Sequence, residues 1–299
     1  MTATLERTPD IYPTRVAAEA KEIAREDAVV WGRTGDGPLN ADELAGYGTR
    51  GYLAVDRLVN PDEVDKLRAE LNRLSADPDV RADERTVVEA RSQEVRSIFE
   101  VHQISEVFDS IVRDPRVVGR ARQILGSDVY VHQSRVNFKP GFGGGDFFWH
   151  SDFETWHAED GMPGMRAVSV SISLTDNHSF NGPLMIMPGS HKTYVSCVGE
   201  TPDENYKSSL VMQGAGTPDG ATLTRMSERH GIDVLAGGAG DAIMFDCNCM
   251  HGSNGNITPF PRSNVFIVFN SVDNACVEPF AAPEARPTFI GARDFTPVG

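Results

Sequence analysis

The sequence predicts a protein built mainly of β-strands, with helices from its first third supporting the β-core. Before Gly126 the apolar residues recur at helical spacing, and after it they alternate with a period of two. Gly, Pro and Asn turns separate the alternating segments, a pattern typical of an antiparallel sandwich or barrel. We expect one domain over residues 1–299, with 1–126 as mainly helical support and 127–299 as the core.

The expected helices of the first third start with Thr14 to Val30, which is rich in Ala, Glu, Lys and Arg. Asn40 can cap a short second helix. Asn60 and Pro61 form a strong start for a third, with Asn as N-cap and Pro at the first helical position. The apolar residues that then recur at helical spacing are Val64, Leu67, Leu71 and Leu74.

A further helix is expected from Ile104 to Leu125, broken or kinked near Pro115. Gly126 can end it, because glycine readily adopts the left-handed conformation found after helix C-termini.

The strands of the core follow from alternation. Val129 to Lys139 places on one face Val131, Gln133, Arg135, Asn137 and Lys139. A second strand alternates Val168, Val170, Ile172 and Leu174 with serines, and a third candidate strand carries on one face Ile243, Phe245, Cys247, Cys249 and His251. Val265 to Phe269 is a further β-rich run. Turns are expected at Gly141 to Gly145 and at Asn181-Gly182-Pro183.

The segment Gly199 to Gly231 is polar and rich in glycine, with a turn expected at Thr217-Pro218-Asp219-Gly220. It is predicted to be a loop insertion in the core. Either a mobile loop near a site or a surface excursion without a role would fit this composition.

The charge balance excludes several classes of partner. The net charge is −15 and the isoelectric point about 4.9, so a nucleic acid or an anionic membrane surface would be repelled. Met1 to Asp27 has no apolar signal-peptide region, and no apolar run reaches the ~18 residues of a membrane span. Four cysteines without a dense disulfide pattern favour a reducing cytoplasm.

One group of residues indicates a chemical function. In an extended segment His150 and Asp152 point the same way and can reach one ion, and His251 follows 99 residues after Asp152. Two imidazoles and one carboxylate leave open positions on Fe(II) for a co-substrate and O₂. Arg262, 11 residues after His251, can hold a carboxylate with two parallel hydrogen bonds. This order is the pattern of 2-oxoglutarate dioxygenases.

Two other interpretations of these residues are open. His150 and His251 could be core histidines with satisfied hydrogen bonds, and Arg262 a surface charge. Cys247-x-Cys249-x-His251 suggests zinc, but the spacing is not the usual Cys-x₂₋₄-Cys and no second cysteine pair follows.

The sequences of several motifs resemble those of a known family. Phe148 to His157, read FWHSDFETWH, and Glu159 to Pro163, read EDGMP, are similar to the signature stretch of ectoine hydroxylases, which belong to the phytanoyl-CoA-dioxygenase-like superfamily. Asn181 to Lys192 is similar to a segment shared across the superfamily, and Val131 to Gly141 also matches. The resemblance runs from about Trp31 to Pro287.

The resemblance implies a double-stranded β-helix core, also called a jelly-roll or cupin-like fold. It implies Fe(II) held by His150, Asp152 and His251, and a soluble homodimer. The residues that it places against 2-oxoglutarate are Lys139, Arg262, Asn137 and Ser253. Those that it places against ectoine are Gln133, Trp156, Arg135, Thr155 and Asn264. The implied reaction is the O₂-dependent hydroxylation of ectoine to 5-hydroxyectoine, with release of succinate and CO₂, in a stress response.

The chemistry of the substrate agrees with two of these residues. Ectoine has a delocalised amidinium and a carboxylate, so Trp156 suits the cation and Arg135 or Gln133 the anion. The alternatives are a hydroxylase of the same superfamily for another small amino-acid-like substrate, and a non-catalytic cupin-like metal-binding protein. A zinc hydrolase is a weaker option.

Overall fold

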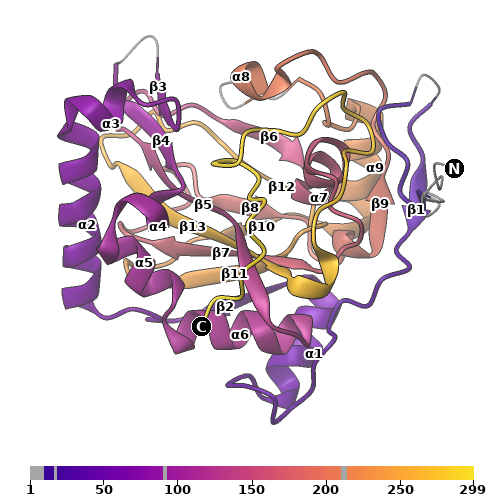
Figure 1. The fold of residues 1–299 in the computed structure, drawn as a ribbon, viewed down its shortest axis with the longest axis horizontal. Coiled ribbons are helices and arrows are strands. Elements are labelled where there is room, and N and C mark those ends of the chain that lie inside the picture. Colours follow the sequence, from indigo (N-terminus) through magenta and orange to yellow (C-terminus); the bar gives the residue numbers. More distant parts are fainter. Residues whose placement is uncertain (1–9, 17–18, 90–92, 210–213) are drawn as a thin grey trace, which may run out of the picture.

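The computed structural model describes residues 10–16, 19–89, 93–209 and 214–299. Two antiparallel sheets form its core (Figure 1). The seven-stranded sheet contains, in order, β2 (Tyr52–Val55), β11 (Ala242–Asp246), β7 (Ala167–Ser173), β13 (Arg262–Ser271), β5 (Val129–Lys139), β4 (Val95–Phe99) and β3 (Thr86–Val88). The four-stranded sheet contains β10 (Asp233–Leu235), β8 (Leu184–Ile186), β12 (His251–Ser253) and β6 (Phe147–His150). Two short strands, β1 (Glu22–Ala24) and β9 (Thr193–Val195), pair separately.

The connectivity is that of a double-stranded β-helix. From β5 to β8 and again from β10 to β13, each strand lies in the other sheet from the strand before it. Such alternation winds the chain around the space between the two sheets, so inward-facing side chains from both sheets meet there. The predicted jelly-roll core is confirmed, and the site described below lies between its sheets.

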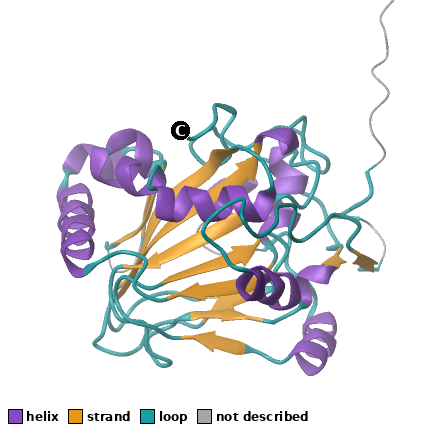
Figure 2. Ribbon diagram, turned by 90° about the horizontal axis from the view of Figure 1, so that it is seen from below, coloured by secondary structure: helices purple, strands orange, loops and turns teal. Residues whose placement is uncertain are grey.

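Helices cover the outer face of the seven-stranded sheet (Figure 2). They are α1 (Ala41–Arg50), α2 (Pro61–Ala76), α3 (Pro78–Ala82), α4 (Val101–Ile104), α5 (Glu106–Val112) and α6 (Pro115–Leu125). One continuous apolar cluster joins them to the sheet and contains Leu67 of α2, Ile124 of α6 and Val170 of β7. Burying this outer face leaves the inner face free for polar side chains, such as the serines of β7.

The predicted helix starts are confirmed. The side chains of Asn40 and Asn60 each accept a hydrogen bond from the backbone amide three residues on, and the glutamate side chain there accepts one from the backbone amide of the cap, forming two capping boxes. The helix expected over Ile104 to Leu125 is instead three short helices. Ser105 caps α5, and Asp114 with Pro115 starts α6, which Gly126 ends with φ 59°.

The helix expected over Thr14 to Val30 is wrong. Its described residues run as an extended strap that pairs through β1 with β9 (Figure 1). Arg15 and Arg25 on the strap are buried in ion pairs with Glu154 and Asp246. Tertiary contacts of this kind outweigh the modest helix propensity of the segment.

Two predictions about strand faces are corrected. The pairing of β13 with β5 shifts by one residue between Val268 and Phe269. Val131 therefore packs with Phe269 in the helix-side cluster, not on the face of Gln133. The strand expected over Ile243 to His251 is broken by a turn, so β11 and β12 lie in different sheets.

The remaining elements are helices that lie outside the two sheets. The predicted insertion 199–231 contains α8 (Asn205–Ser209) and α9 (Gly220–His230), and the expected turn at Thr217 to Gly220 is the start of α9, capped by Asp219. The others are α7 (Asp152–Thr155), the π-helix η1 (Trp156–Asp160), η2 (Ser190–Lys192) and η3 (Val272–Asn274). Among the described residues, no helix is long and apolar enough to cross a membrane.

Candidate metal centre

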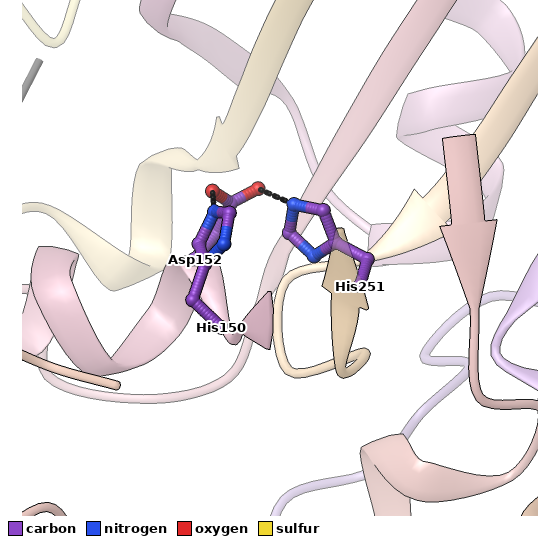
Figure 3. A group of neighbouring side chains, drawn as sticks. All are labelled: His150, Asp152 and His251. Carbon is purple, nitrogen blue, oxygen red and sulfur yellow. Dashed lines mark ion pairs between the residues drawn. The ribbon is translucent and has the colours of Figure 1, made fainter. Parts of the chain in front are cut away.

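Three side chains converge between the two sheets (Figure 3). The ligand atoms of His150, Asp152 and His251 all lie within 4.8 Å of one another. His150 Nε2 is 3.6 Å from one carboxylate oxygen of Asp152, and His251 Nε2 is 3.9 Å from the other. Among the described residues, these three form the group of His, Cys, Asp or Glu side chains that is arranged to hold a metal ion.

The local structure orients these three side chains toward one another. His150 ends β6 and Asp152 begins α7, while β12 pairs with β6 so that His251 lies directly opposite His150. Each imidazole donates from Nδ1 to a nearby carbonyl, His150 to that of Phe148 at 2.6 Å and His251 to that of Cys249 at 3.0 Å. These bonds leave both Nε2 atoms free to face an ion.

The protonation states suit a divalent cation. Burial opposes the charge of Asp152, but His251 and His150 outweigh it and hold the pKa of that carboxyl well below its usual range. Ser169 also donates to Asp152 at 3.2 Å. Burial and the neighbouring His150 lower the pKa of His251 to about 4, so its imidazole is neutral at physiological pH. Two imidazoles and one carboxylate form the facial set that suits Fe(II).

A cavity leads from the two histidines to a pair of buried cations, Lys139 and Arg262. β5, β6, β8, β12 and β13 line it, so it lies between the sheets. Arg262 Nη1 donates to the carbonyl of Gly182 at 2.8 Å, and its Nε is buried with no hydrogen-bond partner among the described residues. Lys139 Nζ donates to Ser253 Oγ at 2.8 Å and to the carbonyl of Asn254 at 2.6 Å.

Neither cation of this cavity forms an ion pair with a carboxylate of the described residues. Burial lowers the pKa of Arg262 to about 10. Burial, with the charges of Arg262 and Arg96, lowers the pKa of Lys139 to about 6. Because isolated buried cations are unfavourable, the cavity is suited to an anion.

A second cavity opens on the other side of the metal ligands. His150 and Asp152 line it together with Gln133, Arg135, Thr155, Trp156, Glu159 and Arg286. Trp156 is 3% exposed and packs edge-on against His132, with ring centroids 5.3 Å apart. The metal group therefore lies where two cavities of different character meet.

Comparison with known proteins decides the family. The phytanoyl-CoA dioxygenase (PhyH) family pattern matches residues 47–264. The chain is 64% identical to the ectoine dioxygenase of Streptomyces coelicolor over the full length of both. It is 50% identical to that of Halomonas elongata over 94% of this chain and 85% of the relative. The chain belongs to the phytanoyl-CoA dioxygenase family, among its ectoine dioxygenases.

Solved structures of the same family agree. A crystal structure of EctD from S. alaskensis with 2-oxoglutarate and 5-hydroxyectoine has a TM-score of 0.88 and 45% identity, covering 96% of both chains. A second, with bound Fe, has a TM-score of 0.86 and 45% identity over 96% of this chain and 95% of that one. The fold of this dioxygenase chain is thus that of an ectoine dioxygenase.

The structure brings together most of the residues that the sequence singled out. Lys139, Arg262 and Ser253 line the cavity of the buried cations. Asn137 and Arg135 line both cavities, and Gln133, Thr155 and Trp156 line the second. Asn264 differs from expectation, because it lines the cation cavity, where its amide donates to Ser171 at 2.9 Å. Cys247 and Cys249, whose spacing to His251 suggested zinc, are buried free cysteines, and neither belongs to the metal group.

Sequence reasoning missed several cavity residues of this dioxygenase chain, Arg286 and Phe147 among them. Arg286, in a segment without regular structure, lines the second cavity and pairs with Asp160 at 2.6 Å. Phe147 lines both cavities and lies under two cations, with Arg96 4.4 Å and Lys139 5.1 Å from its ring centroid. Phe147 directly precedes the quoted motif and could have been noted. Arg286 had no periodic pattern to reveal it.

Proposed function

We propose that this chain hydroxylates ectoine to 5-hydroxyectoine, using Fe(II) and 2-oxoglutarate, with consumption of O₂ and release of succinate and CO₂. One observation carries the proposal. His150, Asp152 and His251 lie between a cavity with two buried basic side chains, which have no carboxylate partner in the described part of the chain, and a second cavity with an aromatic face. The ectoine dioxygenases at 64% and 50% identity support the choice of substrate.

The cation cavity is the proposed site of 2-oxoglutarate. The cavity extends from the two imidazoles to Arg262, so a dicarboxylate can reach the metal group with one end and the guanidinium with the other. Arg262 would bind the distal carboxylate with charge-assisted hydrogen bonds. Lys139, Asn137 and Ser253 would add donors along the same wall.

The second cavity is the proposed site of ectoine. Trp156 offers a ring face for the delocalised cation. Three cavity residues can donate hydrogen bonds to the carboxylate, namely Gln133, Arg135 and Arg286. Thr155 lines the same cavity, and Asn264, on the other side of the metal group, is better placed to support the co-substrate.

Bound Fe(II) would supply O₂ activation coupled to oxidative decarboxylation of 2-oxoglutarate. The residues of the chain supply position and exclusion of water. Asp152 contributes the negative charge, while Phe148 and Cys249 carbonyls fix the two imidazole orientations. The second cavity would hold the substrate beside the metal group and displace water from it.

The deciding assay uses protein loaded with Fe(II) without oxygen, then given O₂, 2-oxoglutarate and ectoine, with succinate and hydroxyectoine followed together. Equal formation of both products is expected. Succinate without hydroxyectoine would mean a dioxygenase of the same family with another small amino-acid-like substrate. Neither product, with iron shown to be bound, would favour a non-catalytic cupin-like metal-binding protein.

We further propose that the chain works as a single domain and a homodimer in the cytoplasm during osmotic or heat stress. Four buried free cysteines support a reducing compartment. Sedimentation of the purified protein would test the dimer, and a sharp single unfolding transition would test the single domain.

A further inference from the structure

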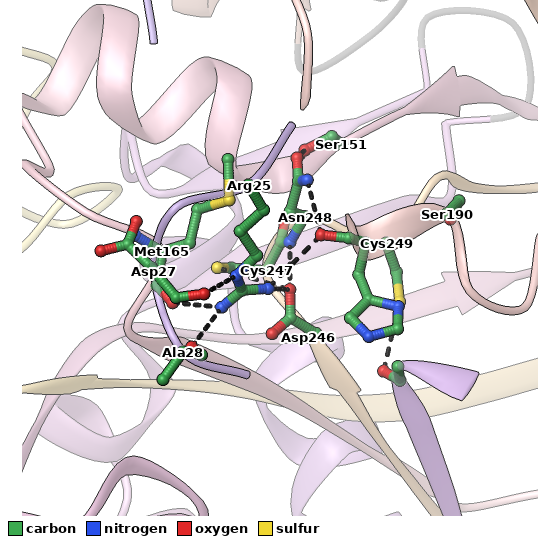
Figure 4. Close-up of polar contacts among 12 residues, drawn as sticks. Arg25, Asp27, Ala28, Ser151, Met165, Ser190, Asp246, Cys247, Asn248 and Cys249 are labelled. Carbon is green, nitrogen blue, oxygen red and sulfur yellow. Dashed lines mark hydrogen bonds and ion pairs between the residues drawn. The ribbon is translucent and has the colours of Figure 1, made fainter. Parts of the chain in front are cut away.

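The turn between β11 and β12 is fixed by the side chain of Asn248 (Figure 4). Asn248 is 2% exposed, and its amide nitrogen donates to the carbonyls of His191 at 3.0 Å and Thr193 at 3.1 Å. Its amide oxygen accepts a hydrogen bond from Ser151 Oγ at 3.0 Å. Both the nitrogen and the oxygen of the amide are thus used, on two separate segments of chain.

The bond to Ser151 joins the two halves of the metal group. Ser151 lies between His150 and Asp152, and Asn248 lies three residues before His251. A parallel backbone bond runs from the amide of Phe153 to the carbonyl of Cys247 at 2.8 Å. These two hydrogen bonds therefore hold the segment with two ligands next to the turn that leads to the third ligand.

The same turn is held from its other side by the N-terminal strap. Asp246 accepts hydrogen bonds from the backbone amide of Asn248 at 2.9 Å and from Arg25 at 2.8 Å. Arg25 is buried and also donates to the carbonyls of Asp27, Ala28 and Met165 (Figure 4). Arg25 lies outside residues 47–264, the part of the chain that the family pattern matches.

We propose that Asn248 is a positioning residue of the metal centre, which holds the His150–Asp152 segment at the correct distance from His251 through Ser151. This inference rests on the proposed Fe(II) site. Asn248 does not touch the ion. Its effect is on the geometry of the three ligands, and so on metal affinity before any turnover.

The test measures Fe(II) affinity of the metal-free protein by anaerobic titration calorimetry. The variants are Ser151→Ala, Asn248→Ala and the double variant. Each single change should weaken Fe(II) binding about 10- to 100-fold, the range typical for groups that orient metal ligands. The double variant should bind no more weakly than Asn248→Ala, because both changes remove the same hydrogen bond. Ser151→Thr, which keeps the hydroxyl, should restore the affinity.

Asn270→Ala is the matched control. Asn270 is also a buried asparagine, and its amide donates to the Tyr130 hydroxyl and the Asn274 carbonyl, both at 2.8 Å. It should lower the melting temperature without weakening Fe(II) binding. A folded Ser151→Ala that binds Fe(II) as tightly as the wild type would overturn the inference, as would an equal loss in Asn270→Ala. If the wild type itself bound no Fe(II), the proposed function would fail first.

Discussion

At the scale of single residues, the site is defined by basic side chains in its cavities that form no ion pair with a carboxylate of the described residues. Arg262 and Lys139 share one cavity, and the half-buried Arg135 has a buried Nε atom without a hydrogen-bond partner among the described residues. Each unpaired cation costs stability in the free protein. That cost becomes binding energy when an anion enters, so these residues are expected to control co-substrate affinity rather than folding.

Lys139 should make co-substrate binding depend on pH. Burial first, then the charges of Arg262 and Arg96, lower its pKa to about 6, although Asp146 opposes them. At pH 7.5 the free amine is mostly neutral, and a bound carboxylate raises its pKa. Binding therefore takes up a proton, and affinity falls as pH rises above about 6, by at most about tenfold per unit for one proton.

Calorimetry of 2-oxoglutarate binding to the Fe(II)-loaded protein without O₂, in buffers of different ionisation enthalpy, measures this proton uptake. Lys139→Met should abolish the uptake and flatten the pH dependence. Arg262→Met should weaken binding and reduce the uptake without abolishing it, because the loss of the guanidinium removes one of the charges that lower the pKa of Lys139. A wild type that takes up no proton at pH 7.5 would contradict the prediction.

Arg262→Ala should raise the apparent KM for 2-oxoglutarate far more than the KM for ectoine. Removing one partner of a buried charged pair costs about 2–5 kcal/mol, which is a factor of about 30 to several thousand in affinity. Steady-state kinetics with each substrate varied in turn would show the difference. Equal increases in the two KM values would mean that Arg262 serves the fold of the whole site.

At the scale of elements, the π-helix η1 connects the metal group to the substrate cavity. It begins at Trp156 and ends at Gly161, which has φ 72°. A Cβ atom there would lie 2.1 Å from the carbonyl oxygen of Val277. The C-terminal segment thus presses closely on the end of η1, and the same π-helix carries Asp160, the partner of Arg286.

Gly161→Ala should therefore displace η1. The left-handed backbone alone costs roughly 1–3 kcal/mol for a residue other than glycine, and the clash with Val277 adds to it. Gly35→Ala is a matched control, because Gly35 has φ 99° with nothing within 4 Å of an added Cβ. Urea unfolding should show the larger loss for Gly161→Ala, and only that variant should raise the KM for ectoine. Identical behaviour of the two variants would remove the role assigned to Gly161.

Elements differ in how far the sequence could predict them. The capping boxes at Asn40 and Asn60 join residues three positions apart, so the local sequence was sufficient to predict these helix starts. His150 and Asp152 were likewise close in sequence, on a segment whose direction could be inferred. The strap around Arg25 could not be foreseen, because its extended form depends on Asp246, 221 residues away. Arg286 was missed for the same reason, since its role depends on Asp160 in a distant element.

At the scale of the whole molecule, the sheets divide two tasks. The outer face of the seven-stranded sheet is buried by helices and supplies the apolar core. Its inner face carries polar and charged groups, including Arg135, Lys139 and Arg262, and the metal ligands come from β6, α7 and β12 across the cavities. Period-two alternation along single strands achieves this division, because neighbouring residues point to opposite faces. A stable core therefore coexists with a strongly polar interior.

The net charge of −15 leads to a prediction for the molecule as a whole. Several carboxylates are buried with cationic partners, as in Glu154 with Arg15 and Asp160 with Arg286. The excess of acidic side chains on the surface then repels itself and lowers the stability of the compact state. Salt should relieve this repulsion, because the Debye length falls from about 10 Å at 0.1 M to about 3 Å at 1 M.

The melting temperature at pH 7.5 should therefore rise between about 0.1 M and about 1 M NaCl, by about 2–4 °C for each kcal/mol of repulsion removed. The control is the same salt series near the isoelectric point of about 4.9, where the net charge vanishes and the rise should be lost. A melting temperature that falls with salt at pH 7.5 would show that attractive surface ion pairs, such as Arg116 with Glu63, outweigh the repulsion. The sign of the salt effect thus decides whether the acidic surface destabilises the fold.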